Sequence, residues 1–205
     1  MLDIKCIVVG PLDVNCYVLT DCNESAVIDP GGDCDRIIDM IGNSHLKMIL
    51  LTHGHYDHTG AVKELSVKTG AKIFIHKDDA IMLEDNTKNL SSLSNTEIET
   101  VSADGFLENG QSIKLGESEI KVYHTPGHSD GSVSLYCSGN LFDGDLLFKG
   151  TIGRFDHGNL RTEFNSLRFL MDNFDDEVKV FPGHGEITSI GTERNQNPYL
   201  LRHLN

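Results

Sequence analysis

Short apolar runs alternate with polar stretches along the 205-residue chain, and the apolar spacing changes between a strand period of two and a helix period of about 3.6. Helical spacing predicts helices that begin near Asp33 and near Thr59, with the second ending at Gly70. Residues 86–112 are polar and lack a clear period, so we expect a long surface segment that could border a site. The remaining predicted helices lie near 77–84 (weaker), 162–173 and 188–195, and the predicted strands at 4–9, 16–20, 26–29, 47–51, 72–75, 112–115, 119–124, 131–137, 140–142 and 178–181.

The order of these elements indicates the fold class. Strands follow one another in runs, and helices are interspersed without the strict alternation of a doubly wound fold. This order fits an α/β (α+β) chain in which two mixed β-sheets pack face to face with helices outside. No linker-like stretch divides residues 1–205, so we expect a single domain.

Composition and charge exclude several classes of protein. The chain has 39% apolar and 23% charged residues, and no apolar run approaches the ~20 residues that span a bilayer. Its first residues, MLDIKCIVVG, lack the pattern of a signal peptide, so we expect a cytoplasmic protein. The net charge of −14, without a basic patch, predicts neither a nucleic-acid nor a membrane partner.

Four apolar strands end in a glycine that is followed by a residue able to bind a metal ion. These corners are Gly54-His55, Gly127-His128, Gly144-Asp145 and Gly183-His184. Glycine allows a sharp turn where a strand ends. Because the strand ends of stacked sheets line one rim, the four corners could converge there.

The densest cluster of ligand-type residues is THGHYDH at 52–58. If the backbone there stays extended, His53 and His55 point the same way, whereas Asp57 and His58 project differently. A lone histidine in a turn is usually incidental, but four corners plus this cluster favour a metal site. We therefore predict two divalent metal ions with Asp145 as a bridge, one held by His53, His55, His128 and Asp145, the other by Asp57, His58, Asp145 and His184.

The donor set bears on the choice of metal. The ligands offer nitrogen and oxygen but no thiolate, which favours zinc, with iron or manganese as alternatives. The five cysteines form no Cys-x-x-Cys pair, so a disulfide framework or a thiolate-rich zinc site is not expected. Seven ligands around two ions leave positions open for water and substrate, unlike a closed structural zinc site.

These residues resemble the metallo-β-lactamase superfamily. The resemblance is carried by THGHYDH with His128, Asp145 and His184, and extends from the NCY and IDPGG stretches to GTERNQNPYL near the end of the chain. Within the superfamily the chain is most similar to glyoxalase II (hydroxyacylglutathione hydrolase) and its short single-domain relatives. The resemblance implies an αββα sandwich with the metals at one edge, held by the same seven ligands.

The expected activity is metal-dependent hydrolysis of a small-molecule thioester, such as S-D-lactoylglutathione, by attack of a metal-bridging hydroxide. Metal binding lowers the pKa of water to about 7, and an open metal position stabilises the developing oxyanion. Asp57 is the candidate catalytic residue, because it could both bind a metal and orient the hydroxide. Asp29 precedes Pro-Gly-Gly at a strand end and is either a partner of a histidine ligand or a turn-forming residue.

The chain departs from glyoxalase II in its substrate contacts. Only residues 185–205 follow the last ligand, so we expect the C-terminal glutathione-binding helical domain to be absent. The family's Lys-x-Tyr contact is matched by Arg154-Phe155-Asp156, and a further family tyrosine by Glu186. Arg154 could bind substrate or only pair with surface acids, and His157 in the same loop could approach substrate. These departures leave glutathione recognition open.

Alternative functions also remain open. Persulfide dioxygenases share the fold, and HTPGHSDGS at 124–132 resembles them; they use one iron, bound by residues that match His53, His128 and Asp145. A non-catalytic metal-binding protein is less favoured, because the ligand set is complete. In the best-known β-lactamase subclass a cysteine stands where this chain has Asp145, which argues against antibiotic hydrolysis.

Overall fold

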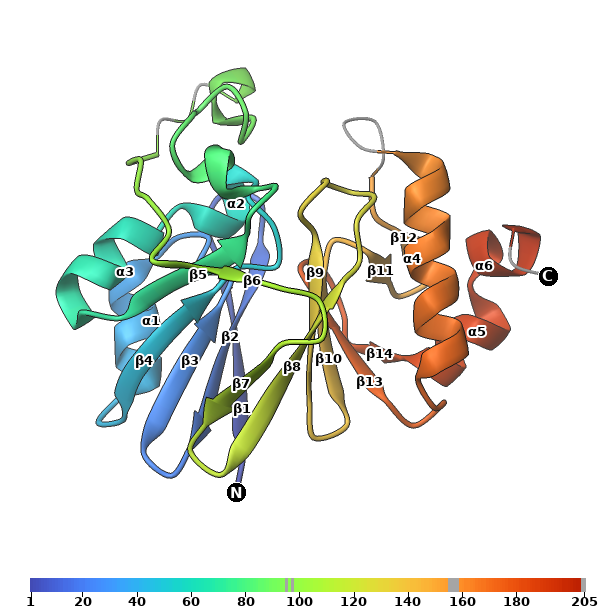
Figure 1. Cartoon of the computed structure of the whole chain (residues 1–205), viewed down its shortest axis with the longest axis horizontal. Helices are drawn as coiled ribbons and strands as arrows, with labels where there is room; N and C mark the ends of the chain where they lie inside the picture. Colours follow the sequence, from blue (N-terminus) through green and yellow to red (C-terminus); the bar gives the residue numbers. More distant parts are fainter. Residues whose placement is uncertain (95, 97, 155–158, 204–205) are drawn as a thin grey trace.

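The computed structural model describes residues 1–94, 96, 98–154 and 159–203, whose strands form two six-stranded mixed sheets and a small hairpin (Figure 1). The first sheet has the order β1 (Asp3–Val9), β2 (Val14–Asp21), β3 (Glu24–Ile28), β4 (His45–Leu50), β5 (Lys72–His76) and β6 (Gly105–Leu107). The second has the order β14 (Thr188–Ser189), β13 (Lys179–Pro182), β10 (Asn140–Gly144), β9 (Val133–Cys137), β8 (Ser118–His124) and β7 (Ser112–Leu115). The hairpin pairs β11 (Leu147–Phe148) with β12 (Thr151–Ile152).

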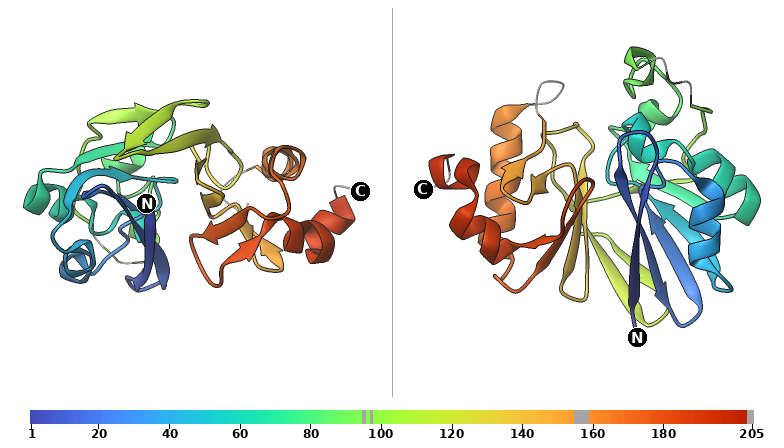
Figure 2. Two further views of the ribbon diagram at one scale, coloured as in Figure 1. Left: turned by 90° about the horizontal axis from the view of Figure 1, so that it is seen from below. Right: turned by 180° about the vertical axis from the view of Figure 1, so that it is seen from behind.

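Helices cover the outer face of each sheet (Figures 1 and 2). On the first sheet these are α1 (Cys34–Ile41) and α3 (Val62–Thr69), and on the second α4 (Leu160–Asn173), α5 (Ile190–Gln196) and α6 (Pro198–His203). The short helix α2 (Tyr56–Thr59) and the 3₁₀ helices η1 (Ala80–Leu83) and η2 (Ser91–Leu93) lie near one end of the sandwich. The predicted αββα arrangement of two mixed sheets is confirmed.

Alternating side chains of the strands build separate apolar layers. Along β2, Val14, Cys16 and Val18 face the core beneath α1 and α3, whereas Tyr17 and Leu19 face the core between the sheets. A third core packs the second sheet against α4 and α5. The Tyr17 ring crosses between the sheets and contacts Phe142 and Phe181, with ring centroids 5.1 and 5.6 Å away. Three apolar layers therefore hold four layers of secondary structure together.

The helix predicted from near Thr59 to Gly70 is present as α3, which begins at Val62 and has Gly70 as its C-cap, whereas the short helix α2 before it was not predicted. The backbone N–H of Ala61 donates to the carbonyl of Pro30 (2.9 Å) rather than continuing α2. Gly31 packs so closely on α2 that a Cβ on it would lie 1.8 Å from the carbonyl oxygen of Asp57. The IDPGG turn thus ends α2 just after the Asp-His pair.

Other predicted boundaries also changed. The weak helix near 77–84 is only the 3₁₀ turn η1, and the segment 86–112 contains η2 and β6. The predicted C-terminal helix begins after the short strand β14 and is followed by α6. Among the described residues, no helix is both long and apolar enough to cross a bilayer.

A buried carboxylate ties the two sheets together away from their ligand-bearing ends. Asp21, at the end of β2, accepts hydrogen bonds from the backbone of Glu117 (3.0 Å) and Ser118 (2.9 Å) in the β7–β8 turn. The Ser118 hydroxyl (2.9 Å) and the terminal amine of Met1 (2.9 Å) also donate to Asp21. These bonds, first that from the amine and then that from Ser118, lower the pKa of Asp21 below its ordinary value.

We expect Asp21→Asn to remove part of the acid sensitivity of folding. A carboxyl with a lowered pKa in the folded state contributes stability above its unfolded pKa of about 4, and that contribution is lost as the pH falls through the lowered value. In urea unfolding, the variant should therefore be less stable than the wild type near pH 7, and the two curves should converge toward about pH 2. The exposed Asp172→Asn on α4 is the control and should follow the wild type. A pH-independent difference for Asp21→Asn would contradict the interpretation.

Candidate metal centre

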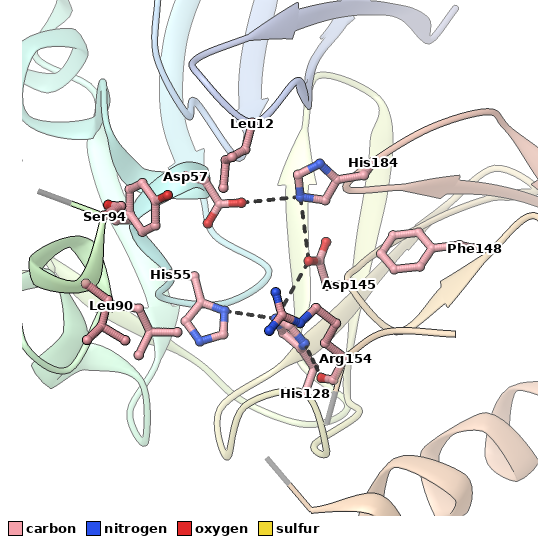
Figure 3. Close-up of a pocket in the computed structure, with 12 residues that line it drawn as sticks. Leu12, His55, Asp57, Leu90, Ser94, His128, Asp145, Phe148, Arg154 and His184 are labelled. Carbon is pink, nitrogen blue, oxygen red and sulfur yellow. Dashed lines mark hydrogen bonds and ion pairs between the residues drawn. The ribbon is translucent and has the colours of Figure 1, made fainter. Parts of the chain in front are cut away.

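The ends of four strands bring the seven predicted ligands to one rim of the sandwich, and Figure 3 shows five of them, His55, Asp57, His128, Asp145 and His184. The segment after β4 carries His53, His55, Asp57 and His58 from the first sheet. The ends of β8, β10 and β13 in the second sheet lead to His128, Asp145 and His184. The ligand atoms lie close to atoms from the opposite sheet, so the predicted convergence of the four corners is observed.

Two of the corner glycines serve different physical purposes. Gly144 has φ 55°, a left-handed conformation that side chains disfavour, and a Cβ there would lie 2.4 Å from the Thr52 hydroxyl oxygen. At Gly183 the limiting factor is space, because a Cβ would lie 2.3 Å from Asp145 Oδ1 and 2.6 Å from the His58 ring. The expectation that these glycines provide only a sharp turn is therefore incomplete.

His53, His55 and His128 form the first group of potential ligands. One nitrogen from each lies within 4.8 Å of the others, and His55 Nδ1 is 2.9 Å from His128 Nε2. Burial, followed by repulsion from neighbouring histidines, lowers the pKa of His53 well below its ordinary value and that of His55 to about 3. Both imidazoles are therefore neutral near pH 7 and hold a lone pair that a metal ion could accept.

Asp57, His58 and His184 form the second group. Asp57 Oδ2 lies 3.3 Å from His184 Nε2 and 3.6 Å from His58 Nε2. Burial opposes ionisation of Asp57, but the hydrogen bond with His184 and the charges of His58 and His184 together outweigh it and lower the pKa of the carboxyl. Asp57 is thus a carboxylate at neutral pH, with two histidine nitrogens facing it.

Asp145 lies between the two groups. Its Oδ1 is 3.4 Å from His58 Nε2, and its Oδ2 is 3.7 Å from His128 Nε2 and 3.6 Å from His184 Nε2. Ligands at about 2.1 Å from a tetrahedral metal ion are separated from one another by about 3.4 Å. The spacing of these atoms therefore matches what two metal shells sharing one carboxylate require.

Buried polar atoms that lack a hydrogen-bond partner also indicate that this site fits two metal ions. Within the described part of the chain, six buried side-chain nitrogen or oxygen atoms lack a hydrogen-bond partner, and three belong to this set: His53 Nε2, His58 Nε2 and Asp145 Oδ1. A buried polar atom without a partner costs about 1–3 kcal/mol. Cations at these atoms would offset that cost, so the residues present fit two metal ions.

The backbone and a neighbouring carboxylate fix the orientation of two histidine rings. His128 Nδ1 donates to the carbonyl oxygen of Arg154 (2.7 Å), which directs Nε2 at Asp145. His58 Nδ1 bonds to Asp29 Oδ2 (3.0 Å), and Asp29 also accepts from the backbone and hydroxyl of Thr52 (2.8 and 2.5 Å). Although Asp29, His53 and His58 also group closely, the Asp29 oxygens are already occupied. The contacts favour Asp29 as a partner of a histidine ligand over a third metal group.

We expect Asp29→Asn to weaken metal affinity by about tenfold, because partners of this kind usually contribute 10- to 100-fold. Asp29 also has φ 52°, which asparagine tolerates well, so this substitution keeps the turn while removing the charge that faces His58. Competition with a chromophoric chelator measures the affinity, with the exposed Asp39→Asn on α1 as control. Unchanged affinity in Asp29→Asn would leave this residue with only its turn-forming role.

Two polar residues that position the candidate ligands, Asp79 and Asn15, were not predicted from the sequence. Asp79 is buried and accepts hydrogen bonds from Gly54 N (3.1 Å), Ser129 Oγ (2.6 Å) and Gly131 N (2.7 Å), so it joins the corner of His55 to the turn that follows His128. Asn15 of β2 donates to the carbonyls of Pro182 (3.0 Å) and Gly185 (2.9 Å) on either side of His184. Both act across the two sheets, and local sequence patterns carry no signal for such contacts.

Glu163 of α4 is a buried acid behind the centre. A Cβ on Gly127 would lie 2.3 Å from its Oε2, so the missing side chain of that glycine makes room for the carboxyl. Burial, and then the charge of Asp145, raises the pKa of Glu163 to about 8. The group is therefore largely neutral near pH 7 and adds little negative charge beside the candidate ligands.

A cavity of about 460 Å³ opens over the candidate ligands (Figure 3). Leu90, Leu93 and Ser94 line it, so the polar segment that was expected to border a site does so. Arg154 also lines the cavity, whereas His157 lies outside the described residues. The remaining lining residues are Leu12, Tyr56 and Phe148 with five of the candidate ligands, His55, Asp57, His128, Asp145 and His184.

Comparison with known proteins defines the class. A model of the metallo-beta-lactamase superfamily matches residues 9–184. The chain is 33% identical to hydroxyacylglutathione hydrolase GloC of Haemophilus influenzae, over 97% of this chain and 98% of that protein. The chain therefore belongs to the metallo-beta-lactamase superfamily, as its residues predicted, and this family membership supports a metal-dependent hydrolase.

Solved structures agree with that assignment. The crystal structure of BLEG-1 B3 metallo-beta-lactamase superposes with a TM-score of 0.91 at 37% identity, covering 97% of this chain and 99% of that one. The crystal structure of TTHA1623 in a di-iron-bound form gives a TM-score of 0.86 at 32% identity, covering 96% and 100%. Both similarities extend over nearly the whole chain.

Proposed function

We propose that this protein is a dinuclear metal-dependent hydrolase that cleaves small-molecule thioesters, of which S-D-lactoylglutathione is one example. The observation that carries the proposal is the pair of three-residue groups, each with its ligand atoms within 4.8 Å of one another, and Asp145 between them at 3.4–3.7 Å from nitrogens of both groups. The GloC relative supports thioester chemistry, and the di-iron form of TTHA1623 supports two metal ions. The donor set favours zinc, with iron or manganese as alternatives.

His53, His55 and His128 would hold one ion, Asp57, His58 and His184 the other, and Asp145 both. When bound, the ions supply an activated water and polarise the substrate carbonyl. Asp57 lines the cavity as a carboxylate, so it can accept a hydrogen bond from the attacking water and orient it toward the carbonyl carbon. A thiolate, with a conjugate-acid pKa of about 8.5, leaves without full protonation, so no general acid is required for its departure.

Arg154 is the proposed substrate contact on the second-sheet side of the cavity. Its backbone carbonyl fixes the ring of His128, and its side chain lines the same cavity. A guanidinium there can bind a carboxylate of the substrate in a bidentate manner. His157 stays a sequence-based prediction for the same role.

Two alternative activities use related chemistry. A mononuclear iron dioxygenase would need only residues such as His53, His128 and Asp145, but it would give no role to the complete second group, Asp57, His58 and His184. β-Lactam hydrolysis is kept as a control reaction because one similar structure is a B3 metallo-beta-lactamase. The absence of a cysteine at the position of Asp145 stays a sequence-based expectation against antibiotic hydrolysis, so β-lactam hydrolysis is measured directly.

The test compares these reactions on two preparations of the protein, one loaded with zinc and one loaded with iron. We expect release of one thiol for each S-D-lactoylglutathione or simple acyl thioester consumed, at the same rate with and without oxygen. Oxygen uptake on glutathione persulfide without thioester cleavage would overturn the proposal. Cleavage confined to β-lactams would overturn the assignment to thioesters.

A further inference from the structure

The walls of the cavity over the candidate metal centre are largely apolar. Five apolar or aromatic side chains line it, from segments far apart in the sequence: Leu12, Tyr56, Leu90, Leu93 and Phe148. In Figure 3, Leu90 and Phe148 lie on opposite sides of the candidate ligands and Leu12 lies on a third. Besides the ligands and the Tyr56 hydroxyl, the described lining adds only two polar groups, Ser94 and Arg154.

Two of these leucines are unusually exposed. Leu93 is 73% exposed and Leu12 is 48% exposed, and both lie at the same cavity although they are distant in sequence. A single exposed leucine needs no explanation, but several apolar side chains gathered around one concave site indicate a surface that binds an apolar group. An occupant that covers these side chains removes their apolar surface from water.

The wall formed by residues 90–93 is anchored to the helix that carries the ligands. The backbone N–H of Tyr56 in α2 donates to the carbonyl of Asn89 (3.0 Å), and the buried Asn89 side chain donates to the carbonyl of Met82 (3.0 Å). Leu90 has φ 70°, a conformation that leucine rarely adopts. These contacts hold the apolar wall at a fixed position beside Asp57 and His58.

Charge near the cavity does not favour a peptide-like dicarboxylate. Arg154 is the one arginine or lysine among the described lining residues. Glu186, which follows His184 closely, forms an ion pair with Lys149 at the exposed margin. Common biological thiol carriers are polar, so the apolar walls match the acyl half of a thioester rather than its thiol half.

From these observations we infer that the site selects thioesters whose acyl group is an apolar alkyl or aryl chain, held between Leu90 and Leu93 on one side and Phe148 on the other. The inference rests on the proposed function and specifies its substrate class. A hydroxyl on the acyl group, as in a lactoyl ester, would be placed against these apolar walls.

The test uses acetyl, butyryl and hexanoyl esters of one thiol, together with the size-matched pair propionyl and lactoyl. Each methylene buried on binding should raise kcat/KM by up to about fourfold, which corresponds to about 0.8 kcal/mol per CH₂. Hexanoyl should therefore exceed acetyl by tenfold or more, and propionyl should exceed lactoyl. A flat or falling series, or a clear preference for lactoyl, would overturn the inference while leaving thioester hydrolysis intact.

A matched pair of variants tests whether the preference for longer acyl chains comes from the apolar wall formed by residues 90–93. Leu93→Ser should reduce the hexanoyl-to-acetyl ratio at least fourfold, because it removes apolar contact with the longer chain. Val67→Ser is the control, since Val67 is 77% exposed on α3 and lies outside the cavity lining. An unchanged ratio in Leu93→Ser would contradict the inference.

A binding measurement keeps this inference separate from the proposed function. Calorimetry with the zinc-loaded protein should show that hexanoate binds at least tenfold more tightly than acetate, and that Leu93→Ser reduces this difference. That result would support the apolar site even if no thioester were hydrolysed. Equal affinities for the two carboxylates would overturn it.

Discussion

Replacing Asp145 by alanine is expected to lower kcat/KM for thioester hydrolysis by about a thousandfold or more, equivalent to about 4 kcal/mol of transition-state stabilisation. The reason is that its two oxygens lie 3.4–3.7 Å from histidine nitrogens of both ligand groups. One substitution therefore removes a ligand from both proposed ions. The measurement is initial rate against substrate concentration, together with metal content after gel filtration.

The control for this variant is Asp172→Ala, the same substitution at an exposed position of α4. It should retain wild-type activity and metal content. Circular dichroism should show that Asp145→Ala keeps its secondary structure, because the apolar layers do not include this side chain. Retention of more than about a tenth of the activity in Asp145→Ala would contradict the assignment of a bridging ligand.

Asp57→Ala is the second variant with a large expected effect. It removes the carboxylate that faces His58 and His184 at 3.6 and 3.3 Å, and with it the proposed group that orients the attacking water. We expect loss of one of two metal ions and a decrease in kcat/KM of about a hundredfold or more, within the usual range for a general base. Metal analysis and thioester kinetics measure both quantities.

A comparison of His53→Ala with Asp57→Ala separates a dinuclear hydrolase from a one-iron enzyme. In a dinuclear hydrolase, both Asp57→Ala and His53→Ala should lose activity, because each removes a ligand from a different ion. In a one-iron enzyme, His53→Ala alone should be inactive and Asp57→Ala should remain close to the wild type. Full activity in Asp57→Ala would therefore contradict the dinuclear mechanism.

The layers and the convergence of the site were predictable because they follow from local patterns. Alternating apolar residues define strands, and two sheets with apolar inner faces must pack together. The glycine corners mark where strands end, so Gly144-Asp145 and Gly183-His184 could be placed at one rim from sequence alone. The structure puts their ligand atoms 3.6 Å apart.

The contacts that position the candidate ligands could not be predicted, because they join residues far apart in the sequence and no local pattern encodes them. Asp79 reads as part of a weak helix, yet its buried carboxylate accepts hydrogen bonds from Gly54 and Gly131, residues that lie far apart in the sequence. The break after α2 depends on the packing of Gly31 against it. The apolar wall was missed because Leu90 and Leu93 are isolated within a polar segment, and only the fold brings them to the cavity.

The most direct test of the central claim is the number of metal ions per chain, with their identity, in protein purified without added metal. Inductively coupled plasma mass spectrometry on the wild type, Asp57→Ala and His53→Ala would give these numbers from one set of preparations. The dinuclear hydrolase predicts two divalent ions in the wild type and about one in each variant. A single iron in the wild type, retained in Asp57→Ala and lost in His53→Ala, would contradict it.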